Sequence, residues 1–136
     1  MPNIPNTING VTVEFSSAVN KNVNQRMIDG LKHVIKPAIA TGYTLNKIYI
    51  SSANDQHTLP SRHAQGKGVD ISRINGKKMS TSYPGDATVK AVVDALQDTF
   101  ETFTHRRENF GPHFKKKLGA NHSVSGHSDH IHFSVN

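Results

Sequence analysis

The chain has no cysteine, which excludes a disulfide framework and catalysis by a thiol nucleophile. Aromatic residues make up only 7% of the sequence. They are mainly phenylalanines at core-like positions and are not interleaved with the lysines. This pattern argues against a nucleic-acid-binding protein, in which stacking rings and cations share one surface.

Long apolar runs are also missing, so no stable membrane insertion is expected. Residues 1–6 have neither the basic segment nor the apolar segment of an export signal. We therefore expect synthesis in the cytoplasm without a signal peptide. Action in the periplasm or cell wall would then follow release or delivery, by a phage lysis, virion or toxin route.

The length of 136 residues predicts a single domain, residues 1–136, which we expect to be a monomer. Sixteen Lys and Arg residues against ten Asp and Glu residues give a net charge of +6. Such a surface favours anionic partners, although a merely soluble basic surface is the alternative. The run Lys115-Lys116-Lys117 is read as a solvated loop, with substrate contact as the second possibility.

Hydrophobic periodicity predicts an α+β fold. Alternating residues indicate strands at 11–15, 47–52, 69–74 and 130–135, and helical spacing indicates helices at 23–35 and 86–103. We expect a small, mostly antiparallel sheet with the two helices on one face and a metal cleft on the other.

Two short stretches, residues 61–70 and 127–132, carry the chemistry. In the second, strand alternation puts His130 and His132 on one face. In the first, Asp70 points away from its apolar neighbours, and nearby glycines allow the loop with His63 to turn back. Two histidines and a carboxylate are typical of a catalytic zinc site with an open fourth position. One Zn²⁺ per chain is therefore predicted.

The pattern Ser61-x-His63-x-x-Gly66-x-Gly68-x-Asp70, followed by Asp129-His130-x-His132, resembles the signature of a family of zinc peptidases. The family includes D-alanyl-D-alanine carboxypeptidases, phage L-alanyl-D-glutamate endopeptidases and the hedgehog signalling domain. The resemblance spans roughly residues 45 to 136. Gly68 replaces the usual alanine, and an arginine often found before the first motif is absent.

This resemblance implies a zinc peptidase with His63, Asp70 and His132 as metal ligands and Asp129 as the general base. A metal-bound water would attack the peptide carbonyl, and the base would take its proton. His127 and His130 are additional catalytic candidates, and His127 takes the base role if Asp129 points away.

The substrate implied by the resemblance is peptidoglycan, cleaved as an endopeptidase in its stem peptides or cross-links next to D-amino acids. Ser61, Asn54 and Gln56 are the candidate substrate-binding residues. A D,D-carboxypeptidase or dipeptidase acting on free muropeptides is the alternative enzyme. A non-catalytic, zinc-stabilised binding module is the alternative of a different class.

Overall fold

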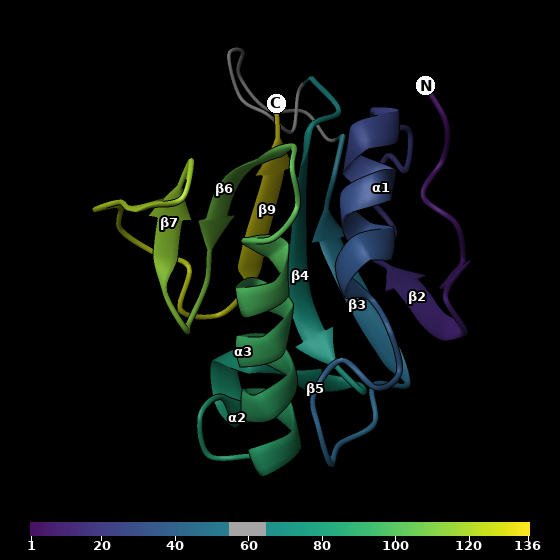
Figure 1. Cartoon of the computed structure of the whole chain (residues 1–136). Coiled ribbons are helices and arrows are strands. Elements are labelled where there is room, and N and C mark those ends of the chain that lie inside the picture. The colour runs from purple at the N-terminus through teal and green to yellow at the C-terminus, as the bar shows by residue number, and fades with distance from the viewer. Residues whose placement is uncertain (55–64) are drawn as a thin grey trace.

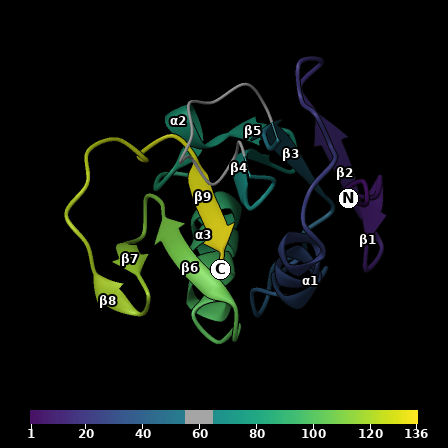
Figure 2. The same cartoon turned by 90° about the horizontal axis from the view of Figure 1, so that it is seen from above.

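A computed structural model describes residues 1–54 and 65–136, and one mixed sheet of nine strands dominates this part of the chain (Figures 1 and 2). The strand order is β1-β2-β3-β4-β9-β6-β7-β8, and β5 pairs with β4. The strands are β1 (Thr7–Ile8), β2 (Val11–Phe15), β3 (Lys47–Ser52), β4 (Gly68–Ile74), β5 (Lys77–Lys78), β6 (Arg106–Phe110), β7 (Lys115–Lys117), β8 (Ala120–Asn121) and β9 (Ile131–Val135). The helices are α1 (Gln25–Val34), α2 (Met79–Ser82) and α3 (Ala87–Phe100).

The predicted fold class is wrong. The sheet is large and mixed, because β2 and β3 run parallel. Helix accounts for only 22% of the described residues, in three short helices, which is not an α+β fold with two helices packed on one face of a small sheet. The error has a physical cause: β1, β5, β7 and β8 contain two or three residues each, too few to show a hydrophobic period. The lysine run read as a loop is strand β7.

Strand β9 lies between β4 and β6, and its five residues are all buried. Ile131 and Phe133 are fully buried in the apolar core, as the alternation predicts. Antiparallel pairing with β4 sets Asp70 directly opposite His132 and Val69 opposite Phe133. The last strand of the chain therefore meets the strand that carries the first motif at the centre of the sheet.

Both longer helices begin with a side-chain cap. The side chain of Asn24 accepts a hydrogen bond from the Arg26 amide at 2.9 Å, and that of Asp86 accepts one from the Val89 amide at 3.0 Å. Such caps satisfy amides that have no partner within the helix. The helix predicted from residue 86 thus begins at the cap of α3.

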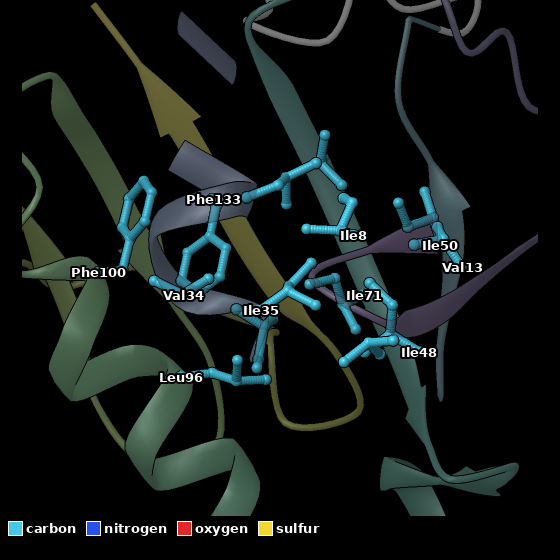
Figure 3. Packing of buried hydrophobic residues seen from close by; sticks show 14 of the residues in the cluster. Ile8, Val13, Val34, Ile35, Ile48, Ile50, Ile71, Leu96, Phe100 and Phe133 are labelled. Carbon is cyan, nitrogen blue, oxygen red and sulfur yellow. The ribbon is translucent and has the colours of Figure 1, made fainter. Parts of the chain in front are cut away.

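The apolar core joins α1 and α3 to the central strands (Figure 3). Phe100 of α3 stacks on Phe133 of β9 with ring centroids 4.1 Å apart. Gly30 of α1 lies against Phe100 and Phe103, so the helices approach closely where a side chain is missing. The two helices and β9 thus share one closely packed core.

Candidate functional site

The predicted site residues divide between the described and the undescribed parts of the chain. His63, Ser61 and Gln56 lie outside the described residues. Asn54 is described, and its side-chain amide donates to the Asn22 carbonyl oxygen at 2.7 Å. That contact ties the end of the β3 segment to the loop before α1, so this amide is engaged within the protein.

Asp70 and His132 lie side by side, because β4 pairs with β9. His132 Nδ1 is 2.9 Å from Asp70 Oδ1, across the register of β4 and β9. His132 is only 8% exposed. The structure therefore brings one residue from each of the two predicted stretches into direct contact.

Glu108 of β6 is the third member of this group, and the sequence analysis missed it. Its Oε1 lies 3.1 Å from His132 Nε2 and accepts a hydrogen bond from the Ser134 hydroxyl at 2.8 Å. Alternation along β6 places Glu108 and Phe110 on one face, which is the signal that the sequence offered. Only the pairing of β6 with β9 shows that Glu108 lies next to His132. Asp70, His132 and Glu108 are called the carboxylate–histidine triad below.

The triad carries strongly shifted pKa values. Burial alone would lower the pKa of His132, but hydrogen bonds and charge from Asp70 and Glu108 outweigh it and raise the pKa to about 9. Burial likewise tends to raise the pKa of Glu108, yet the contacts with His132, Ser134 and Arg107 lower it to about 2. At neutral pH His132 is therefore an imidazolium between carboxylates.

The predicted zinc site is corrected by this geometry. Among the residues that the structure describes, no group of three His, Asp or Glu side chains is arranged to hold a metal ion. Both ring nitrogens of His132 face carboxylate oxygens, so as an imidazolium the ring donates two hydrogen bonds and offers no lone pair to a cation. Of the expected ligands, Asp70 is engaged with His132, and His63 lies outside residues 1–54 and 65–136.

His127 and His130 form a second group beside the triad. Their ring centroids are 4.9 Å apart, and the centroid of His127 is 6.0 Å from that of His132. The ring of Phe110 contacts both His127 and His132, at centroid distances of 5.1 and 5.8 Å. Phe110 thus contacts two of these histidines, and His127 in turn contacts His130.

Each histidine of the second group is oriented through Nδ1. His127 Nδ1 lies 3.1 Å from the Ser125 carbonyl oxygen, to which it can donate, and His130 Nδ1 lies 2.6 Å from Asp129 Oδ1. His127 also has a φ of +68°, an uncommon conformation for a residue other than glycine. In both rings Nε2 is the nitrogen that can serve as a proton donor or acceptor for another molecule.

Asp129 is paired with its neighbour rather than with the triad residues. The hydrogen bond with His130 is the largest cause of its lowered pKa. The pKa of His127 is also lowered, first by burial and then by the charges of His130 and His132. His127 is therefore the neutral imidazole of the site at pH 7, which fits the base role better than the low-pKa carboxylate does.

Comparison of the chain with protein-family models, with curated proteins and with solved structures finds no match. Within the described residues, no helix has the length and apolar character needed to cross a membrane. The geometry of the site is therefore the basis for a functional proposal.

Proposed function

We propose that this protein is a peptidase that hydrolyses peptide bonds in peptidoglycan stem peptides or cross-links. The observation that carries the proposal is the grouping of His127, His130 and the carboxylate–histidine triad at one end of β9. The substrate class follows from the resemblance of residues 61–70 and 129–132 to peptidoglycan peptidases, and the net charge of +6 suits an anionic wall.

In the proposed chemistry His127 acts first as a base and then as an acid. Nε2 of His127, which is neutral at pH 7, takes a proton from water as the water oxygen attacks the peptide carbonyl. When the C–N bond breaks, the same Nε2 passes that proton to the leaving amine, so the ring returns to its neutral form. His130 lies beside this ring and orients the water, and Asp129 is a positioning residue that holds His130 through Nδ1.

The triad has a supporting role in this proposal. Its two carboxylates and one imidazolium hold β4, β9 and β6 together beneath the reacting groups. Burial is the main reason for the lowered pKa of His127, and the positive charge of His132 adds to it, because two neighbouring cationic rings repel each other.

A second candidate is a non-catalytic module that binds wall peptides. Asp70, His132 and Glu108 use their polar atoms in hydrogen bonds with one another. This favours the binding module, because such a network is typical of a structural role. The two candidates differ in a direct way: only the enzyme creates new peptide termini.

The test is incubation of the purified protein with peptidoglycan sacculi, followed by mass spectrometry of the released fragments. We expect new termini that identify the bond, and a His127→Gln variant should be slower by roughly 10²–10⁴-fold, the usual contribution of a general base. His105→Gln removes a histidine just before β6, where Arg106 pairs with Val135 at the far end of β9, and should cleave like wild type. Binding of sacculi without new termini would support the binding module instead.

A further inference from the structure

In the described part of the chain, three hairpins have two-residue turns, and in each turn both residues have positive φ. They are Asn9-Gly10 between β1 and β2, Asn75-Gly76 between β4 and β5, and Leu118-Gly119 between β7 and β8. Such turns favour Asn-Gly, because asparagine tolerates the left-handed region far better than bulky residues do. Leucine at position 118 therefore departs from the pattern that the same chain uses twice.

The side chain of Leu118 contributes little to the packing of the fold. Leu118 has a φ of +52° and its side chain is 61% exposed, whereas most large apolar side chains are buried. Its backbone amide donates to the Arg107 carbonyl oxygen at 2.7 Å, an interaction that any residue could make. A strained, exposed apolar residue at a hairpin tip points to a contact outside the chain.

Positive charge surrounds the tip. Residues 106–121 contain five Lys or Arg residues and a single carboxylate, Glu108. Arg106 and Arg107 are paired with Glu101 and Glu108, at 3.4 and 3.7 Å. By contrast, neither Lys116 nor Lys117 forms an ion pair with any residue that the structure describes. Figure 2 shows β7 and β8 at the outer edge of the sheet, on the side away from β1 and α1.

We propose that the β7–β8 hairpin docks on the surface of an anionic lipid bilayer. Leu118 enters the interfacial layer, while Lys116 and Lys117 meet the acidic headgroups. Basic residues beside an exposed apolar side chain are the combination that holds proteins at a membrane surface without spanning it. An anionic polymer such as teichoic acid would attract the lysines but would offer no apolar environment to Leu118. This inference does not depend on the proposed hydrolysis.

The experiment is co-sedimentation of the full chain with vesicles of phosphatidylcholine, alone or with about one third phosphatidylglycerol. We expect binding to the anionic vesicles only, weakened by salt. Leu118→Asn should lower the affinity about tenfold, since the apolar contact is lost. Lys116→Gln combined with Lys117→Gln should lower it about 25-fold, at roughly fivefold per lysine.

Two controls make the result decisive. Leu118→Asn creates the turn found in the other two hairpins, so it should unfold at the wild-type temperature or above, and misfolding cannot explain lost binding. Lys32→Gln combined with Lys36→Gln removes the same charge from exposed positions in and after α1 and should bind like wild type. If the wild-type protein does not co-sediment with anionic vesicles, the proposal is overturned. Undiminished binding by Leu118→Asn, with loss in the lysine variant, also overturns it, because charge alone would then account for the attraction to the vesicles.

Discussion

His132 is a buried histidine that is charged because two carboxylates enclose it. Burial of a lone imidazolium is unfavourable, but Asp70 and Glu108 each accept a hydrogen bond from one ring nitrogen. The arrangement is stabilising only while the ring keeps both protons. The stability of the protein should therefore depend on pH in a defined window.

We predict that the free energy of unfolding falls as the pH rises from about 6.5 to about 9. The pKa of His132 is 6.5 in the unfolded reference and about 9 in the folded protein. The folded protein therefore binds this proton more tightly than the unfolded chain does, and the stability that results is lost as alkali removes the proton. On the acid side, Glu108 contributes stability above pH 4.5, and this contribution is lost toward pH 2. Urea unfolding at a series of pH values from about 2 to about 9 measures both the alkaline and the acid loss of stability.

Glu108→Gln is the matched variant for this prediction. With one carboxylate gone, His132 binds its proton less tightly, so the free energy of unfolding should fall less between pH 6.5 and 9. At pH 7 the variant should be less stable than wild type by about 3 kcal/mol. Glu14→Gln is the control, because Glu14 is a half-exposed residue 3.7 Å from Lys47, and its loss should change stability by less than about 1 kcal/mol. A wild-type protein equally stable at pH 6.5 and 9 would contradict the assigned charge of His132.

At the scale of elements, periodicity was informative where a segment was long enough to show it. The predicted strands at residues 11–15 and 47–52 match β2 and β3, and the apolar stripe that contains Leu96 and Phe100 is the buried face of α3. At Asn75-Gly76, two residues suited to positive φ form the turn between β4 and β5.

The neighbours of each strand were not predictable in the same way. Alternation placed Asp70 and His132 on polar faces, and their contact followed once the two strands paired. Glu108 could not be assigned, because its role depends on β6 pairing with β9 across the intervening residues 111–130. Local sequence reports which face a residue takes but not which strand lies next to it.

For the helices, we predict that Asn24→Ala lowers the stability by about 1 kcal/mol. The Asn24 side chain accepts a hydrogen bond from the Arg26 amide at the start of α1, and alanine leaves that amide without this partner. Asn24→Asp keeps an oxygen at the same place and should retain most of the stability. Thermal unfolding followed by circular dichroism distinguishes the two variants, and equal losses would show that the cap is unimportant.

For the whole molecule, the strand order explains why the site needs the entire chain. The triad takes Asp70 from β4, Glu108 from β6 and His132 from β9, and the C-terminal strand completes it from the middle of the sheet. Strand β3, beside β4, is in turn covered at its outer edge by β2 and β1. The N-terminal strands thus protect the sheet that holds the site.

We therefore predict that a chain lacking residues 1–15 loses its fold. The deletion removes four buried side chains, Ile4, Ile8, Val11 and Val13, each contributing about 1.5–3 kcal/mol, which together rivals the total stability of a typical domain, about 5–15 kcal/mol. It also exposes the edge of β3, where Ile48 and Ile50 offer a template for pairing with other chains. Circular dichroism should show lost structure, and size-exclusion chromatography should show larger species than the full chain forms. Thr12→Val changes an exposed side chain of β2 without removing the strand, so it should behave as the full chain does. A truncated chain that stays folded and elutes as expected for its mass would mean that β3 tolerates an open edge.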